Sequence, residues 1–222
     1  NKTILETNGF TVKGDAPYTW AELDLISQTL VGNGDNQCEY LVNYDVPSTM
    51  FRTSLLQSEV DFVDSGGNTI INTVEMTSLL DEFKARFDNN TFVLPAHYGA
   101  QYGSYNFKDG DLCMTSTLAG TLRYNDPASN FDFEVLSVPQ HSASNEAYSY
   151  TGQNTAIFNQ SSDAEMLAAW LFSRYLASEE VQLDLALQSG SIPVLDSVYQ
   201  NADFLSFLSA PTEEQKYHSM GL

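Results

Sequence analysis

Apolar residues recur at helical spacing in several segments of the chain, and polar capping signals precede three of these segments. In each signal a Ser, Thr or Asn stands three residues before a Glu, which is the arrangement of a capping box. The capping pairs are Thr19–Glu22, Asn72–Glu75 and Ser162–Glu165. The periodic patterns predict helices over residues 2–8, 19–31, 50–60, 73–87, 163–178, 179–188 and 201–209.

Short runs of apolar, aromatic and β-branched residues, bounded by turn residues, predict strands between these helices. The predicted strands cover residues 38–44, 111–116, 133–138 and 155–159. A two-glycine turn between β-favouring runs predicts a small hairpin over residues 60–72. Because helices and strands mix along the chain without an internal repeat, the predicted fold class is α/β.

The composition supports a folded domain and narrows the classes of partner. The chain has 222 residues, 42% of them hydrophobic, which is enough apolar material for one large core or two modest ones. It carries 29 acidic against 9 basic residues, so its net charge is -20 and its field repels phosphate groups. Nucleic acids and anionic membrane surfaces are therefore poor partners. No apolar run approaches the roughly 20 residues of a membrane span.

The sequence contains no catalytic, metal or cofactor motif. The histidines His97, His141 and His218 stand in no metal-binding spacing, and neither a phosphate-binding glycine loop nor a nucleophile elbow occurs. Residues 61–68 hold spaced oxygen atoms but do not match a calcium loop, so a turn is the favoured interpretation. We therefore predict no catalytic residue, no metal ligand and no cofactor.

The two cysteines, Cys38 and Cys113, have no metal-binding spacing. Cys113 lies inside an apolar run, which favours a buried side chain over a reactive thiol. Whether the two cysteines form a disulfide stays open, because two positions in a sequence do not fix a pairing.

Four segments, taken in order, resemble the extracellular solute-binding proteins of ABC importers, in the sugar-binding, maltose-binding-protein-like group. The start "NKTILETNGF…APYTWAELDLISQTL" resembles the family's stretch after the first hinge between its two lobes. "FKDGDLCM" resembles its Phe-x-x-Gly-x-x-x-Met strand, and "FEVLSVPQ" resembles the strand that follows. The stretch from "GQNTAIFNQ" to "SIPVLDSVY" resembles its loop, strand, capped helix and Gly-x-x-Pro turn. The resemblance covers essentially the whole chain, although it includes neither a first lobe nor the closing helices.

This resemblance implies a lobe of the periplasmic-binding-protein type II kind, a mixed sheet flanked by helices. Residues 1–158 would form the second, ligand-facing lobe of a longer protein. Residues 159–210 would be a crossover strand and helices that dock on the absent first lobe, and residues 211–222 would begin the return segment. Because the helices within 163–188 carry wide apolar faces, we expect the fragment to cover them by pairing as a homodimer or by folding them back onto residues 1–158. The homodimer is the favoured outcome.

The resemblance also implies where a ligand would bind. The strand around Met114 would end in hydroxyl side chains at the cleft, with Ser116 or Thr117 capping a helix that begins near Leu118. This turn is expected to face the ligand, because ligands favour the carboxyl ends of strands in such sheets. Two further loops should meet it: one after residues 38–44, and one over residues 150–154, where the family brings a small residue near the ligand. The predicted ligand-binding residues are Tyr44, Ser48, Thr49, Phe51, Ser116, Thr117, Gly152, Gln153 and Asn154.

The implied function is the capture of a sugar or oligosaccharide and its delivery to an ABC permease, without catalysis. The protein would be extracellular or periplasmic and anchored as a lipoprotein. A polyol-phosphate binding protein, of the glycerol 3-phosphate type, is the first alternative, with Arg52 and Arg123 as candidate partners of the phosphate. A secreted glycan-active enzyme with two carboxylates in the cleft is a more remote alternative.

Overall fold

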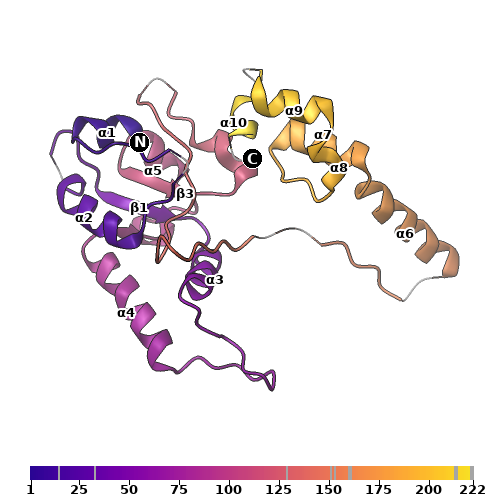
Figure 1. Ribbon diagram of the computed structural model, residues 1–222, viewed down its shortest axis with the longest axis horizontal. Helices are drawn as coiled ribbons and strands as arrows, with labels where there is room; N and C mark the ends of the chain where they lie inside the picture. Colours follow the sequence, from indigo (N-terminus) through magenta and orange to yellow (C-terminus); the bar gives the residue numbers. More distant parts are fainter. Residues whose placement is uncertain are drawn as a thin grey trace. The chain divides into compact units, whose positions relative to one another are not determined.

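The computed structural model describes residues 1–14, 16–32, 34–128, 130–150, 152, 154–159, 162–212 and 215–220. Within it the chain forms two compact units (Figure 1). The first unit contains Asn1–Thr117 and Asn125–Tyr150, and the second contains Leu118–Tyr124 and Thr151–Leu222. The boundaries expected at residues 158 and 210 stay predictions.

A small parallel sheet forms the centre of the first unit. Its described strands are β1 (Tyr40–Tyr44), β2 (Phe92–Val93) and β3 (Leu112–Ser116), in the order β2-β1-β3. Both neighbours run parallel to β1, and every residue of β1 is buried. Parallel strands are covered on both faces, which explains why β1 reads as a continuous run of apolar and aromatic residues around Asn43. The strands 38–44 and 111–116 are thereby confirmed.

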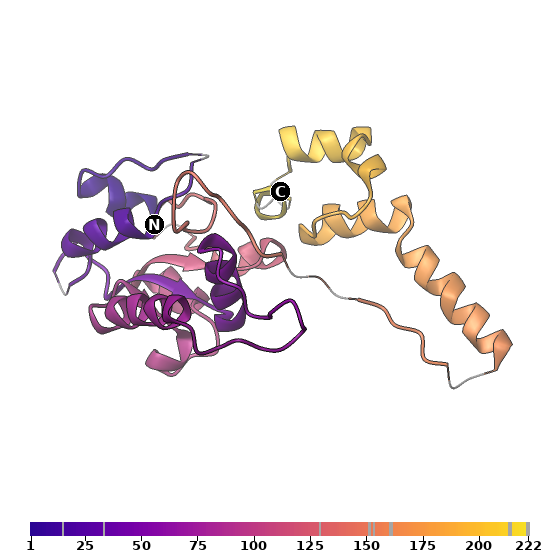
Figure 2. The ribbon, with the colours of Figure 1, turned by 60° about the horizontal axis from the view of Figure 1, so that its bottom comes forward.

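Helices surround this sheet in both views (Figures 1 and 2). They are α1 (Lys2–Thr7), α2 (Trp20–Leu30), α3 (Pro47–Gln57), α4 (Val74–Asp88), α5 (Ser104–Asp109) and the 3-10 helix η1 (Pro95–Tyr98). The main core joins α2, α3 and α4 to β1, with Trp20, Leu23, Leu41 and Phe83 among its buried members. A smaller core gathers β2, β3 and α5 around Phe107.

Capping explains where several of these helices begin. Thr19 accepts from the Glu22 backbone N–H while the Glu22 carboxylate accepts from the Thr19 N–H, so the predicted capping box is present. The α4 cap is Thr73, not the predicted Asn72: its hydroxyl accepts from the Met76 N–H. Thr73 directly precedes the first helical residue, Val74, so its hydroxyl reaches the Met76 N–H. The N-cap therefore lies one residue later than predicted.

Arg86 of α4 joins that helix to α2. Its guanidinium forms a two-pronged contact with Asp24, with the Nη2–Oδ2 distance at 2.9 Å and the Nε–Oδ1 distance at 2.9 Å. The same group lies over the ring of Trp20, 5.1 Å from the centroid. The Arg86 side chain is only 11% exposed, so this contact covers the edge of the main core next to Trp20.

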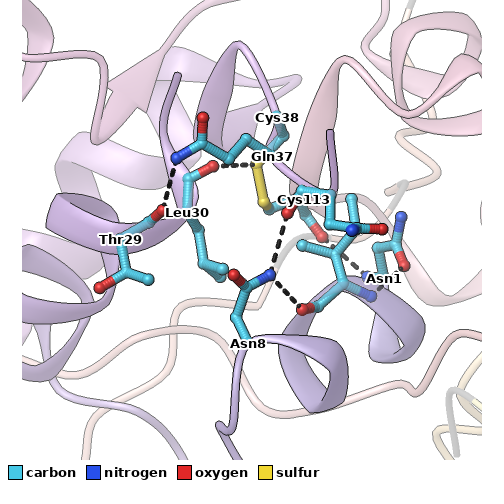
Figure 3. The surroundings of a disulfide bond; sticks show 9 residues. Asn1, Asn8, Thr29, Leu30, Gln37, Cys38 and Cys113 are labelled. Atoms are coloured by element: carbon cyan, nitrogen blue, oxygen red, sulfur yellow. Dashed lines mark hydrogen bonds between the residues drawn. A yellow bond between two sulfur atoms is a disulfide. The ribbon is translucent and has the colours of Figure 1, made fainter. Parts of the chain in front are cut away.

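Cys38 and Cys113 form a disulfide, which settles the pairing that the sequence left open (Figure 3). Cys38 lies just before β1 and Cys113 lies in β3, so the bond joins neighbouring strands across a sequence separation of 75 residues. Both residues are buried. The backbone nitrogen of Asn1 donates to the Cys113 carbonyl oxygen at 2.7 Å, which fixes the start of α1 against β3. Disulfides persist in oxidising compartments outside the cytosol.

The predicted strand over residues 133–138 is wrong. This segment has no regular partner strand, and one isolated bridge, Thr19 to Gln140, marks its end. Side chains hold it instead: the buried Gln57 donates to the Pro139 carbonyl oxygen at 3.0 Å, and Gln140 accepts from the Ala147 N–H at 3.0 Å. No described strand pairs with this segment, and an extended run without a neighbour gains no ladder hydrogen bonds.

The predicted strand over 155–159 and the predicted hairpin over 60–72 also differ from the structure. Residues 155–159 are irregular, and Phe158 is exposed, because an apolar run without a neighbouring strand gains nothing from an extended ladder. The hairpin is reduced to a single antiparallel bridge between Val63 and Thr69. In both views the segment between α3 and α4 loops away from the sheet (Figures 1 and 2).

The second unit is helical in its described part. It contains α6 (Asp163–Leu176), α7 (Glu179–Ser189), α8 (Asp196–Tyr199), α9 (Ala202–Ser209) and α10 (Lys216–Ser219). A small core of Ala186, Val198, Phe204 and Phe207 joins α7, α8 and α9. Helix α6 buries none of its residues, although its Ser162–Glu165 capping box is present as predicted. Among the described residues, no helix is long and apolar enough to cross a membrane.

Candidate ligand-binding site

The carboxyl ends of the parallel strands meet at one edge of the sheet, hereafter the carboxyl edge. Asn43 of β1 pairs in register with Val93 of β2 and Thr115 of β3. Tyr44, the last residue of β1, pairs with Ser116, the last residue of β3. Two of the predicted ligand-binding residues, from segments about 70 residues apart, are therefore brought together at this edge.

Tyr44 supports the carboxyl edge from inside the core. Its side chain is buried, and its ring packs near Trp20 and Phe92. Burial raises the pKa of the Tyr44 hydroxyl well above its ordinary value, and a hydrogen bond with Ser116 opposes this shift. The Tyr44–Ser116 pair thus fixes the ends of β1 and β3 to each other, while Ser116 stays partly exposed.

The loop after β1 enters α3 directly, so three predicted residues belong to the first turns of that helix. Ser48 is exposed, and its hydroxyl has no hydrogen-bond partner among the described residues. Thr49 is partly exposed, and its carbonyl oxygen accepts from the Ser149 hydroxyl at 3.5 Å. Phe51 is partly buried and packs against the main core. Ser48 and Thr49 therefore present polar groups, whereas Phe51 contributes to packing.

Thr117 follows β3 and leads into a tight helical turn. The helix predicted to begin near Leu118 is a 3-10 helix, η2 (Ala119–Asn125), in place of an α-helix. The Thr121 N–H donates to the Leu118 carbonyl oxygen at 2.9 Å, which closes its first turn. Thr117 itself is partly exposed.

The remaining predicted residues lie in the other unit. Gly152 and Asn154 are exposed residues of the second unit, and Gln153 falls outside the described residues. A Cβ placed on Gly152 would meet nothing within 4 Å, so no close backbone approach by the described residues explains this glycine. Their convergence with the carboxyl edge stays a prediction.

The sequence reasoning missed a polar network at the same edge. Asp45, the residue after β1, accepts from the Gly103 N–H at 2.7 Å and from the Asn43 amide at 2.8 Å. The Asn43 amide also donates to the Thr115 hydroxyl at 3.1 Å, and Tyr98 donates to the Asn43 amide oxygen at 2.7 Å. The only sequence signal was two polar residues, Asn43 and Asp45, alternating through the end of a buried strand.

Burial and a nearby charge keep Tyr98, the outer donor of this network, protonated. Burial raises the pKa of Tyr98 well above its ordinary value, and the nearby charge of Asp45 raises it further. Tyr98 therefore stays protonated and acts as a hydrogen-bond donor. Hydroxyl, amide and carboxylate groups at one sheet edge can bind a ligand that carries hydroxyl groups. Among the described residues there is no cluster of side chains that could hold a metal ion.

A family model for bacterial extracellular solute-binding proteins matches residues 1–210. The chain belongs to this family. No curated protein matches it. The family assignment places the protein in the periplasm or outside the cell, and the buried disulfide agrees with that compartment.

Solved structures with the same fold are distant in sequence. The cyclic alpha-maltosyl-1,6-maltose binding protein of Arthrobacter globiformis has 20% identity and a TM-score of 0.68, over 100% of this chain and 55% of its own. UgpB of Mycobacterium tuberculosis, in complex with glycerophosphocholine, has 17% identity and a TM-score of 0.69, over 98% and 53%. The substrate-binding protein Lmo0181 of Listeria monocytogenes, in complex with cycloalternan, has 18% identity and a TM-score of 0.68, over 99% and 54%.

These likenesses confirm the predicted α/β fold of the periplasmic-binding-protein type II kind. The chain spans about half the length of the solved structures it matches. Members of this family bind solutes for ABC importers and are not enzymes.

Proposed function

We propose that this chain is the ligand-facing second lobe of a protein that captures a sugar or oligosaccharide and delivers it to an ABC permease, without catalysis. The observation that carries the proposal is the family match over residues 1–210. It is supported by relatives whose names or ligands include cyclic maltosyl-maltose and cycloalternan. The carboxyl edge, with Asp45, Ser116 and Thr117, offers the polar groups that sugar hydroxyls require.

In the intact protein this edge would close on the first lobe around the ligand. Closure of two lobes around a ligand is the general behaviour of periplasmic binding proteins, so one lobe alone loses much of the binding surface. We therefore expect the 222-residue chain to bind weakly or not at all, and the intact protein to bind tightly. Calorimetry on both, with the same saccharide, measures the difference, and equal affinities would argue against a two-lobe clamp.

The experiment that tests the function is a thermal-shift and hydrolysis screen of the intact protein. The panel contains maltose, cyclic alpha-maltosyl-1,6-maltose, cycloalternan and glycerophosphocholine. A raised melting temperature with one saccharide and no released product is the expected result, because a ligand that binds only the folded state stabilises it. Release of product from any saccharide would favour the glycan-active enzyme.

A polyol-phosphate ligand is the second candidate, favoured by the fold likeness to UgpB in complex with glycerophosphocholine. A phosphate needs a basic partner, and the two candidates lie apart in the sequence. Arg52 is exposed on α3 and forms no ion pair with a described residue, while Arg123 donates to the hydroxyl of its neighbour Tyr124 at 2.9 Å. A shift with glycerophosphocholine alone, in the same screen, would select this candidate.

Helix α6 gives a separate reason to propose a larger protein. Leu167, Trp170, Leu171 and Phe172 are all large apolar residues that remain exposed on it. Leaving such side chains in water forfeits roughly 1.5–3 kcal/mol each. We propose that the rest of a longer protein covers this face, because the solved relatives have almost as much chain again as this one spans. The homodimer is not supported by the comparisons, and light scattering at several concentrations tests it.

Lipoprotein anchoring completes the proposal. A capture protein that serves a membrane permease benefits from being held at the membrane surface, and a lipid chain provides such an anchor. Partitioning of the native protein into the detergent phase of a Triton X-114 extract is the expected result. Recovery from the aqueous phase alone would contradict the anchor and leave the capture function unaffected.

A further inference from the structure

The Asp45 carboxylate is fixed at the carboxyl edge by two hydrogen bonds. Asp45 is the first residue after β1, and it is partly exposed. Its Oδ1 atom accepts two hydrogen bonds, from the Gly103 N–H at 2.7 Å and from the Asn43 amide at 2.8 Å. Two donors on one oxygen fix the position and the rotation of the whole carboxylate.

The groups behind Asp45 are themselves fixed. Asn43 is 0% exposed, and its amide group is held on both atoms, by Thr115 and by Tyr98. A Cβ on Gly103 would lie 2.3 Å from the Asn43 amide nitrogen, so a glycine is required for this close approach. The network therefore holds the Asp45 carboxylate in one orientation before any ligand arrives, which is the condition for a precise binding contact.

The second carboxylate oxygen of Asp45, Oδ2, is not used by the network. It has no hydrogen-bond partner among the described residues, and no described Lys, Arg or His forms an ion pair with Asp45. An ionised carboxylate can only accept hydrogen bonds. Oδ2 is therefore available to accept a hydrogen bond from a ligand. It lies at the carboxyl edge, where ligands bind in parallel sheets.

We propose that Asp45 is a ligand-contacting residue that accepts a hydrogen bond from a hydroxyl group of a neutral polyol and excludes phosphate. This inference rests on the proposed sugar-binding function and selects between its two ligand classes. The Asp45 N–H donates to the Ser116 carbonyl oxygen at 3.4 Å, so Asp45 lies beside the end of β3 that carries the predicted ligand-binding hydroxyls. A negative charge fixed at this position repels an anionic group and strengthens a hydrogen bond from a hydroxyl.

The test is Asp45→Asn in the intact protein, with binding measured by calorimetry. The Asn side chain keeps an oxygen for the Gly103 N–H and replaces the free acceptor by an NH₂ donor. The probes are maltose, cyclic alpha-maltosyl-1,6-maltose, cycloalternan, glycerophosphocholine and glycerol 3-phosphate. We expect the affinity for the saccharide that the wild type binds to fall about tenfold or more, because hydrogen bonds to charged groups are the strong ones. Because glycerophosphocholine carries a cationic choline beside its phosphate, glycerol 3-phosphate is the probe for phosphate exclusion: its affinity should rise in Asp45→Asn, and no rise would overturn that part of the inference.

Asp64→Asn is the matched control. Asp64 is also a carboxylate held by backbone amides, those of Gly66 at 2.9 Å and Asn68 at 2.8 Å, but it lies in the turn between α3 and α4. The Asp64→Asn substitution removes one negative charge, as Asp45→Asn does, and should leave saccharide affinity unchanged. Tyr98→Phe loosens Asn43 without touching Oδ2, so a smaller loss of affinity is expected from it.

The outcomes separate two failures. If the wild type binds a saccharide and Asp45→Asn binds it equally well, this inference is wrong and the proposed function stands. If Asp64→Asn loses as much affinity as Asp45→Asn, net charge and not a contact explains the effect, which also overturns the inference. If the wild type binds no saccharide but binds glycerophosphocholine, both the inference and the sugar-binding function fail.

Discussion

Helices α2 and α6 begin with the same local signal and end in different surroundings. Each opens with a complete capping box, Thr19 with Glu22 and Ser162 with Glu165. Yet α2 buries several large apolar residues, Leu23 completely among them, while α6 buries none. Capping and periodicity fix where a helix forms, but burial depends on which other segments of the chain are available to cover it.

The same contrast holds for the two units as a whole. The first unit has a sheet, a core that joins three helices to that sheet, and a disulfide that ties two of its strands together. The described core of the second unit is four residues. Helices of this length are marginal in water without tertiary packing, so we expect the second unit to need a covering partner more than the first.

Removing the disulfide should give the largest effect and confine it to the first unit. Cys38→Ala/Cys113→Ala releases a cross-link that closes a loop of 75 residues. Constraining the unfolded chain over such a loop is worth about 4 kcal/mol, so the free energy of unfolding should fall by roughly that amount. Urea unfolding followed by tryptophan fluorescence measures it, because Trp20 lies in the first unit's core.

Hydrogen exchange on the same double variant tests the confinement. Amides of β1 and β3 should lose protection, whereas amides of α7 and α9 should keep theirs. The wild type treated with reductant should behave like the double variant, and reductant should not change the variant further. Equal loss of protection in both units would show that they unfold as one.

Truncating one leucine in α2 and one in α6 should give very different costs in the fragment, and this difference should narrow in the intact protein. Leu23 is 0% exposed and Leu167 is 57% exposed. In the 222-residue chain Leu23→Ala should cost about 3 kcal/mol, and Leu167→Ala less than about 0.5 kcal/mol. In the intact protein the cost of Leu167→Ala should rise above 1 kcal/mol if a missing segment covers α6. Chemical denaturation of all four proteins decides this, and an unchanged small cost would leave α6 without a partner.

Local signals explain which parts of the fold could be predicted. The capping boxes at Thr19 and Ser162, and the apolar strands ending at Tyr44 and Ser116, depend on neighbouring residues only, and each appears as expected. The segment 133–138 has an equally good strand pattern and forms none. Its pairing depends on a neighbour elsewhere in the chain, which a periodicity does not reveal.

The candidate site shows the same limit. Hydroxyls and an aromatic at strand ends were predicted, and two of them, Tyr44 and Ser116, do meet at the carboxyl edge. Asp45 was missed because, in a chain with 29 acidic residues, one more carboxylate carries no signal. Its fixed orientation depends on Gly103, which is 58 residues away in the sequence and donates to it. Such a contact exists only after folding.

Breaking the Asp24–Arg86 contact should have a moderate effect on the first unit. Asp24→Asn leaves the guanidinium of Arg86, 11% exposed, to its longer contact with Glu82 at 3.5 Å, and Asp24 itself is 35% exposed. Fully buried pairs cost several kcal/mol to break, but partial exposure screens this one, so about 1–2 kcal/mol is expected. The loss should shrink as salt is raised. Lys84→Ala, which removes an exposed ion pair with Asp88 on the same helix, is the control and should change stability by less than about 0.5 kcal/mol.

The smallest expected effects come from the two capping boxes, and they return to the comparison of α2 with α6. Thr19→Ala should lower the free energy of unfolding by about 1 kcal/mol, because α2 belongs to the first unit's core. Ser162→Ala removes an equivalent cap from a helix that buries nothing, so it should speed hydrogen exchange in the first turn of α6 and leave the unfolding midpoint unchanged.

The stability loss of Thr19→Ala should depend on pH, because the cap includes a carboxylate. The pKa of Glu22 is lowered by its contact with Lys13 and by the Thr19 N–H, and the pKa of Glu165 is lowered by the Ser162 N–H, both from an ordinary value of 4.5. A carboxylate whose pKa is lower in the folded state stabilises that state fully above pH 4.5, and this contribution disappears as the pH falls through the lowered value. Thr19→Ala removes the hydroxyl that donates to the Glu22 carboxylate at 3.0 Å but keeps the Lys13 contact and the backbone N–H, so its loss should shrink slightly as the pH falls from about 6 through the lowered pKa of Glu22. Urea midpoints across that pH range measure it. A difference that stays constant with pH would show that the bond from the Thr19 hydroxyl to the Glu22 carboxylate contributes nothing to the cap.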